Sequence, residues 1–241
     1  MRLLLGLAIV ALLPVLPLLP AARADDPLQG VDLTRLGRDD RRDVREVQAA
    51  PTAACEVRET VRCRTGVYRF LLGRLPLAAR AVEALNLEGT GRYLVEDAGA
   101  GRFTIDDRAG ATAECSRAWD EEGLLVVVAR GRLDVPVLPR ILGTGVIVVR
   151  YAPSPDDPGL VAARAHVLFR LSNRLLRALS TPVREVLSRV LRDKLALLVR
   201  TASALAEALE RDPAGVLAAL EAAGTVDPDD LRALRVAALV H

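Results

Sequence analysis

The spacing of apolar residues changes between the middle of this chain and its C-terminal part. Between residues 92 and 171, apolar and polar residues mostly alternate, which is typical of β-strands. Between residues 182 and 211, apolar residues recur at every third or fourth position, which is typical of one long helix of about 42 Å. Because a curved antiparallel sheet cannot bury its inner face alone, this order predicts a sheet covered by the long helix.

Turn residues divide the alternating part of the chain into several strands. Leu124–Ala129 and Val146–Val149 are apolar at consecutive positions, which predicts strands that are covered on both faces. Val161–Leu171 alternates more regularly and predicts a strand with one buried face. Earlier in the chain, residues 55–63 alternate as a further strand would, and residues 67–85 have the spacing of two short helices.

These segments predict an α+β fold, in which a curved antiparallel sheet of about six or seven strands packs on a long C-terminal helix, with extra C-terminal helices. The extra helices begin at Asp212-Pro213 and Asp227-Pro228, because proline suits the first helical position. The expected organisation is a signal peptide at 1–24, a flexible or helical N-terminal arm at 25–50, the sheet-and-helix domain at 51–211 and a C-terminal helical extension at 212–241.

The first residues have the three parts of a secretory signal peptide: a basic start, the apolar run Leu3–Leu19, and the small residues Ala22 and Ala24 around a cleavage site. Prolines in and after the run disfavour a retained membrane helix, because proline lacks an amide donor. We expect cleavage between Ala24 and Asp25. The expected mature protein is soluble, periplasmic or secreted, and has no integral membrane segment.

The charge of the expected mature chain excludes one class of partner. Two of the 33 basic residues, Arg2 and Arg23, leave with the leader, and none of the 31 acidic residues does, so residues 25–241 are formally neutral. A neutral chain lacks the positive surface that nucleic-acid binding requires, so we expect no nucleic-acid partner. Lys194 is the only lysine in a chain that otherwise uses arginine.

Three cysteines, Cys55, Cys63 and Cys115, would meet an oxidising compartment after export. On one straight strand Cys55 and Cys63 would lie about 26 Å apart, far beyond the roughly 7 Å between Cα atoms that a disulfide tolerates. The possible disulfide therefore joins Cys115 to Cys55 or to Cys63. Three small buried thiols are the favoured alternative. The spacing does not match a zinc site, and we expect neither a metal nor a cofactor.

The order of a strand, two short helices, antiparallel strands and a long helix resembles the helix-grip fold of the START-like lipid-transfer, polyketide-cyclase and coenzyme-Q-binding superfamily. The resemblance spans residues 55–211 and lies in the order of the elements, without a diagnostic motif. It implies a cavity between the sheet and the helix at 182–211. Such cavities bind lipids, quinones, sterols or aromatic polyketides. No site residue is carried over from the family.

Candidate cavity-lining residues come from the predicted strands and from the long helix. Trp119 belongs to this set because it shares a strand face with Cys115 if the alternation continues, although ordinary packing is the favoured alternative for a lone tryptophan. The full set is Trp119, Phe103, Val126, Val128, Ile147, Phe169, Leu191 and Leu198. Neither His166 nor His241 belongs to a catalytic motif, and the acid pairs lie at turns or helix starts.

The leading hypothesis is a protein that binds an apolar small molecule, such as a lipid or quinone, in this cavity and is not an enzyme. A structural or interaction domain is the alternative, and it would have a filled core and a flat apolar patch on the convex strand face. A cyclase- or hydrolase-like enzyme is third and needs an ionisable cavity residue with a perturbed pKa, for which Glu114, Arg130 and Arg132 are the strand-borne candidates. The ligand and the oligomeric state stay open.

Overall fold

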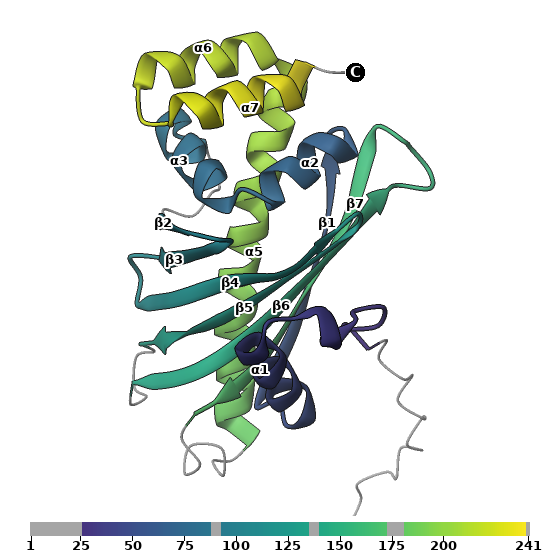
Figure 1. The fold of residues 1–241 in the computed structure, drawn as a ribbon, viewed down its shortest axis with the longest axis vertical. Helices are drawn as coiled ribbons and strands as arrows, with labels where there is room; N and C mark the ends of the chain where they lie inside the picture. The colour runs from purple at the N-terminus through teal and green to yellow at the C-terminus, as the bar shows by residue number, and fades with distance from the viewer. Residues whose placement is uncertain (1–25, 88–92, 135–139, 173–180, 240–241) are drawn as a thin grey trace, which may run out of the picture.

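The computed structural model describes residues 26–87, 93–134, 140–172 and 181–239, and the expected leader lies outside these ranges. In the described residues a seven-stranded antiparallel sheet has the strand order β1-β7-β6-β5-β4-β3-β2 (Figure 1). The strands are β1 (Ala53–Arg62), β2 (Leu94–Gly99), β3 (Arg102–Asp106), β4 (Ala111–Glu121), β5 (Leu124–Leu133), β6 (Ile141–Pro153) and β7 (Leu160–Leu171). The predicted antiparallel sheet is confirmed.

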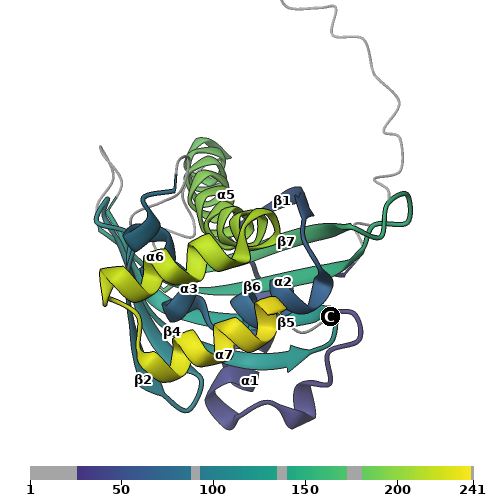
Figure 2. The same ribbon diagram turned by 90° about the horizontal axis from the view of Figure 1, so that it is seen from above.

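Helices cover both faces of this sheet (Figure 2). The long helix α5 lies along one face, which we call the concave face, and α1 lies on the opposite, convex face. The helical elements are η1 (Leu33–Arg35), α1 (Arg38–Ala49), α2 (Thr65–Leu72), α3 (Leu75–Leu85), α5 (Thr181–Arg211), α6 (Pro213–Ala223) and α7 (Pro228–Leu239). The α+β class, the long helix and the extra C-terminal helices agree with the prediction, and the arrangement is that of a helix-grip protein.

The sequence of β5 explains why both faces of this strand are buried. Leu125 and Val127 point into the main core, on the face that α5 covers. Leu124, Val126 and Val128 point the other way, into a second apolar cluster. The continuous apolar run therefore predicted the double cover correctly.

The cover on the convex face comes from the N-terminal segment of the chain. Val44 and Val47 of α1 are fully buried against the second cluster. Arg130 of β5 donates to Asp40 Oδ1 over 2.7 Å and to Asp43 Oδ2 over 2.5 Å, so charged hydrogen bonds join α1 to the sheet. The flat apolar patch that an interaction domain would expose on this face is therefore covered by α1.

The extra C-terminal helices pack beyond one end of the sheet, beside α2 and α3 (Figure 1). Asp212 caps α6 by accepting a hydrogen bond from the backbone N–H of Gly215 over 2.9 Å, and Pro213 takes the first turn as expected. Leu220 and Leu234 are buried between these helices and the rest of the core. Within the described ranges, no helix combines the length and apolar character needed to cross a bilayer.

The cysteines do not form the disulfide that we considered. Cys55, Cys63 and Cys115 are all free and buried. Cys55 lies in β1 and Cys63 follows that strand, whereas Cys115 lies in β4, so β7, β6 and β5 separate them in the sheet. The proposed pairing of Cys115 was wrong because strand order cannot be read from the spacing of cysteines. The alternative of three buried thiols is confirmed.

Candidate ligand-binding site

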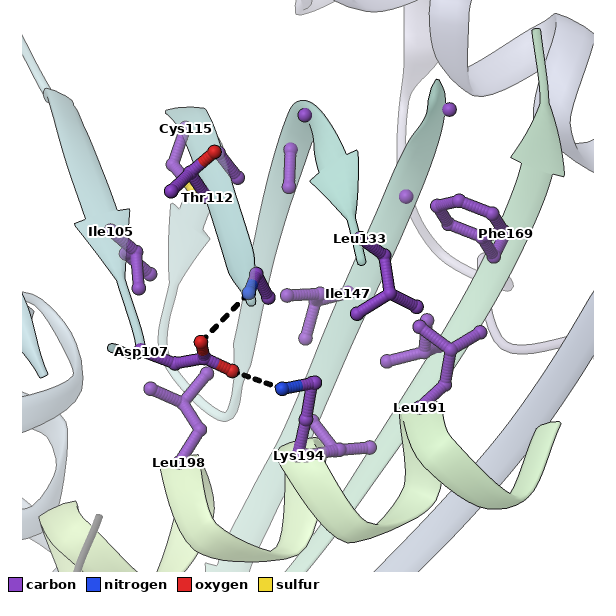
Figure 3. A pocket seen from close by; sticks show the side chains of 18 of the residues that line it. Ile105, Asp107, Thr112, Cys115, Leu133, Ile147, Phe169, Leu191, Lys194 and Leu198 are labelled. Atoms are coloured by element: carbon purple, nitrogen blue, oxygen red, sulfur yellow. Dashed lines mark hydrogen bonds and ion pairs between the residues drawn. The ribbon is translucent and has the colours of Figure 1, made fainter. Parts of the chain in front are cut away.

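A cavity of about 160 Å³ lies between the concave face of the sheet and α5 (Figure 3). Strands β3 to β7 form its base and sides. Leu191, Leu195 and Leu198 of α5 close it from the other side. Apolar side chains make up most of this lining, so a molecule in the cavity would contact mainly carbon atoms.

The base of the cavity consists of very small side chains that the strand register brings together. Ala113, Gly131 and Gly143 are aligned across β4, β5 and β6, and Cys115, Ala129 and Gly145 form the next such row. We call these six residues the small-residue floor. Larger residues such as Ile105, Ile147 and Phe169 surround it. Space remains above the floor because these six positions carry at most one heavy atom beyond Cβ.

The three glycines of the floor have different reasons to lack a side chain. A Cβ on Gly131 would lie 2.1 Å from the carbonyl oxygen of Thr112, so the two strands approach too closely for any other residue. A Cβ on Gly143 would lie 2.3 Å from the ring of Phe169, which crosses this glycine. At Gly145 the nearest atom would be 3.7 Å away. Gly145 is therefore not required by packing, and its missing side chain leaves open space.

One end of the cavity carries an ion pair (Figure 3). The ammonium of Lys194 on α5 donates to Oδ2 of Asp107, which follows β3. Oδ1 of Asp107 accepts the backbone N–H groups of Ala109 and Ala111, each over 2.8 Å. Burial acts to raise the pKa of Asp107, but the hydrogen bonds from Lys194 and the backbone outweigh it, so the pKa lies below its ordinary value. Asp107 is thus a fixed carboxylate.

Two further ionisable groups on the cavity wall, Cys115 and Tyr93, are held in their neutral forms. Burial raises the pKa of the Cys115 thiol to about 12. Burial, followed by the nearby charge of Asp107, also raises the pKa of the Tyr93 phenol, whose oxygen lies 3.5 Å from the carbonyl oxygen of Lys194. Neither group is activated as a nucleophile or base.

The structure places only four of the eight expected cavity-lining residues on the cavity wall. Ile147, Phe169, Leu191 and Leu198 lie on its wall. Phe103 instead lines a separate, more polar pocket of about 260 Å³ between the turn from β2 to β3 and the start of α3. This pocket contains the arginines at positions 74, 102 and 117.

Trp119 lies on the opposite face from the cavity, in the second apolar cluster, where the guanidinium of Arg35 stacks 4.5 Å from its ring centre. The cause is a β-bulge in β4. Arg117 pairs with Val127, but Trp119 pairs with Val126, so one extra residue is inserted between them. A single inserted residue reverses the faces of all later positions in a strand. Strict alternation from Cys115 therefore assigned Trp119 to the wrong side.

Val126 and Val128 are also corrected by the structure. Both are fully buried on the convex face, next to α1, and neither reaches the cavity. Val127, between them, pairs with Ile147 and belongs to the concave core. In a run that is apolar on both faces, composition alone does not say which alternate positions face α5.

Asp107, Lys194 and Tyr93 also line the cavity, although they were not among the residues expected there. Lys194 had two signals: it is the only lysine in the chain, and it follows Leu191 by three positions and precedes Leu198 by four, within the apolar stripe of the helix. Asp107 was interpreted as an ordinary turn residue, which it also is. Nothing local to position 107 indicates that α5 lies above it.

None of the strand-borne candidates for catalysis projects a charged group into the cavity. Glu114 is exposed, and Arg130 is paired with α1 on the convex face. Arg132 lies at the cavity rim with an exposed side chain that alternates with Gly131 of the floor. His166 lies 3.5 Å from Glu56, and burial lowers its pKa, while His241 is outside the described residues. In the described part of the chain, no group of three or more His, Cys, Asp or Glu side chains could hold a metal ion.

Comparisons with known proteins give fold-level neighbours only. No family model matches the chain, and no curated protein sequence does. Ara h 8.0201 is 8% identical, with 62% of this chain and 94% of that chain covered and a TM-score of 0.41. Norcoclaurine synthase from Thalictrum flavum is 8% identical, with 63% and 91% covered and a TM-score of 0.41. The Zhui aromatase/cyclase from Streptomyces sp. R1128 is 17% identical, with 64% and 93% covered and a TM-score of 0.40.

Proposed function

We propose that this protein binds an apolar small molecule, such as a lipid or a quinone, in the cavity beneath α5 and carries out no chemistry on it. The observation that carries the proposal is the small-residue floor, where six aligned positions leave space inside an otherwise packed core. Protein interiors are normally filled to the density of organic crystals, so an aligned patch of Ala, Gly and Cys is costly unless the space is used.

The cavity volume limits how much of the ligand is enclosed. A cavity of about 150 Å³ holds one benzene-sized ring, whereas pockets for drug-sized ligands usually measure about 300–1,000 Å³. The volume of about 160 Å³ therefore suits a single ring or a short stretch of alkyl chain. A larger ligand would place the rest of its atoms outside this enclosed volume.

Two other functions fit the described residues less well. An interaction domain with a filled core has no use for the floor, and the convex patch that it would present is covered by α1. A cyclase or hydrolase needs an activated acid or base, but Asp107 and Lys194 neutralise each other. The raised pKa values of Tyr93 and Cys115 leave them protonated.

We also propose that binding takes place outside the cytoplasm, on the strength of the leader predicted at residues 1–24. Expression of the full chain in a bacterial host, followed by fractionation and N-terminal sequencing, tests this part independently. We expect the mature protein in the periplasm or medium with Asp25 at its N-terminus. Uncleaved protein that remains in the cytoplasm would contradict it.

The binding proposal is tested by purifying the protein without detergent and analysing it by native mass spectrometry and organic extraction. We expect a co-purifying apolar molecule that is lost on denaturation. Ala129→Leu fills the floor and should abolish its retention, whereas Ala162→Leu adds the same atoms at an exposed position of β7 and should not. If the wild-type protein retains nothing and takes up no member of a panel of lipids and quinones, the proposal is refuted.

A further inference from the structure

The polar end of the cavity contains more hydrogen-bond donors than the protein uses. An ammonium group has three N–H donors. In the part of the chain that the structure describes, Asp107 is the only acceptor for the ammonium of Lys194. Lys194 lies between Leu191 and Leu198 on the face of α5 that closes the cavity, and its side chain is 26% exposed (Figure 3). Donors therefore remain available where an enclosed ligand would lie.

Asp107, in contrast, has its acceptors occupied and its charge matched. It accepts hydrogen bonds from Ala109, Ala111 and Lys194, and its side chain is 9% exposed. The pair as a whole has no net charge. A ligand at this end thus meets free N–H groups beside a carboxylate that is already satisfied.

We infer that the ligand is an uncharged molecule with an oxygen acceptor, of the ketone, quinone or phenol class, and that this oxygen accepts a hydrogen bond from Lys194. The inference rests on the proposed function and specifies the chemistry of its ligand. A ring carrying such an oxygen places its apolar atoms over the small-residue floor and its oxygen at the Asp107–Lys194 pair. A hydrogen bond from a charged donor adds affinity without a new charge to desolvate.

A carboxylic acid such as a fatty acid fits this end poorly. Its carboxylate would share one ammonium with Asp107, so two negative charges would lie side by side against an apolar lining. Arg132 at the rim does not offset this, because its side chain is exposed to solvent. A purely apolar ligand fits too, but leaves the donors of Lys194 without an acceptor.

The test uses three small compounds of similar size: ethylbenzene, acetophenone and benzoate. Their dissociation constants are measured by titration calorimetry on the full-length mature protein. We expect acetophenone to bind about tenfold more tightly than ethylbenzene, and benzoate more weakly than acetophenone. Because Lys194 is the only lysine, protein made with ¹³C-labelled lysine gives one Cε signal, which should shift with acetophenone and not with ethylbenzene.

The matched variant is the double substitution Lys194→Met with Asp107→Asn, which removes the pair without leaving an unpaired charge. It should lose the preference for acetophenone over ethylbenzene, measured as the ratio of the two dissociation constants, while Lys194→Arg should keep a preference. Equal binding of acetophenone and ethylbenzene by the wild type overturns the inference and leaves the proposed function standing. Tighter binding of benzoate overturns it in favour of an anionic ligand. If none of the three compounds binds, the inference is overturned, and uptake of the lipid and quinone panel decides the proposed function separately.

Discussion

The two faces of strands β4, β5 and β6 differ in the size of the side chains that they present to their covering helices. Toward α5 these strands carry the small-residue floor. Toward α1 the alternate positions of the same strands carry large aliphatic side chains, including Leu124, Val126, Val128, Val146 and Val148. The backbone is shared, and only the alternate side chains differ. One face encloses a cavity, and the other is filled.

This difference shows that the cavity follows from side-chain volume and register rather than from the helix-on-sheet arrangement itself. A covering helix approaches a sheet only as far as the largest facing side chains allow. On the concave face, Ile105, Ile147 and Phe169 surround the floor, and the space over the small residues stays open. On the convex face Val44 and Val47 of α1 are fully buried against the second apolar cluster.

The largest expected effect concerns the tightest point of the small-residue floor. Gly131→Ala places a Cβ 2.1 Å from the Thr112 carbonyl oxygen, so the strands must separate, and we expect a loss of about 3 kcal/mol in unfolding free energy. Gly145→Ala meets its nearest neighbour at 3.7 Å, and its effect should stay within about 1 kcal/mol. Urea denaturation measures both. Equal losses of unfolding free energy in the two variants would mean that the close approach of β4 and β5 does not require glycine at position 131.

The next effect concerns the attachment of α1 to the convex face. Arg130→Met leaves Asp43, whose side chain is 11% exposed, without its partner on the sheet, and should cost about 2 kcal/mol. Hydrogen exchange should accelerate in α1 before it does in α5. Arg132→Met, two positions along β5, removes an exposed arginine and should change stability by less than about 0.5 kcal/mol. A comparable loss from both variants would show that the contacts with α1 contribute little.

The most direct comparison of the two faces uses neighbouring residues of β5. Val128→Leu adds a carbon to the filled convex face and should destabilise by about 1.5 kcal/mol through overpacking. Ala129→Leu adds more atoms, but into the cavity, and should leave stability unchanged or raise it slightly. Thermal denaturation of the ligand-free proteins distinguishes them. If Ala129→Leu is the more damaging variant, the cavity is smaller than the structure indicates.

The smallest effect is a pH dependence on the convex face. A hydrogen bond from Arg164 is the main cause that lowers the pKa of Glu56 in β1 from 4.5 to about 2. Because the folded value is the lower one, this carboxylate contributes stability above pH 4.5 that is lost as the pH falls toward about 2. Glu56→Gln should therefore flatten the acid part of the stability curve in that window. An unchanged slope would contradict this assignment. Asp107→Asn should flatten the acid limb in the same direction from the concave face.

Local patterns in the sequence predicted the class and order of the elements. The change of apolar spacing near residue 180 reflects the geometry of single strands and single helices, so it predicted both the sheet and α5. The continuous run in β5 likewise predicted cover on both faces. Phe169, Leu191 and Leu198 could be selected because each belongs to a clear pattern within one element, whereas Ile147 lies in a run that is apolar on both faces.

Which face of the sheet is open, and which residues meet inside it, depends on contacts between distant parts of the chain. The bulge before Trp119 reverses the sheet face on which every later residue of β4 lies, and no local sequence pattern predicted this bulge. The floor exists because small residues of three strands share a register, and Asp107 meets Lys194 across 87 positions of sequence. Spacing within one element is set by local backbone geometry, whereas register between strands and the docking of a helix depend on packing between segments far apart in the chain.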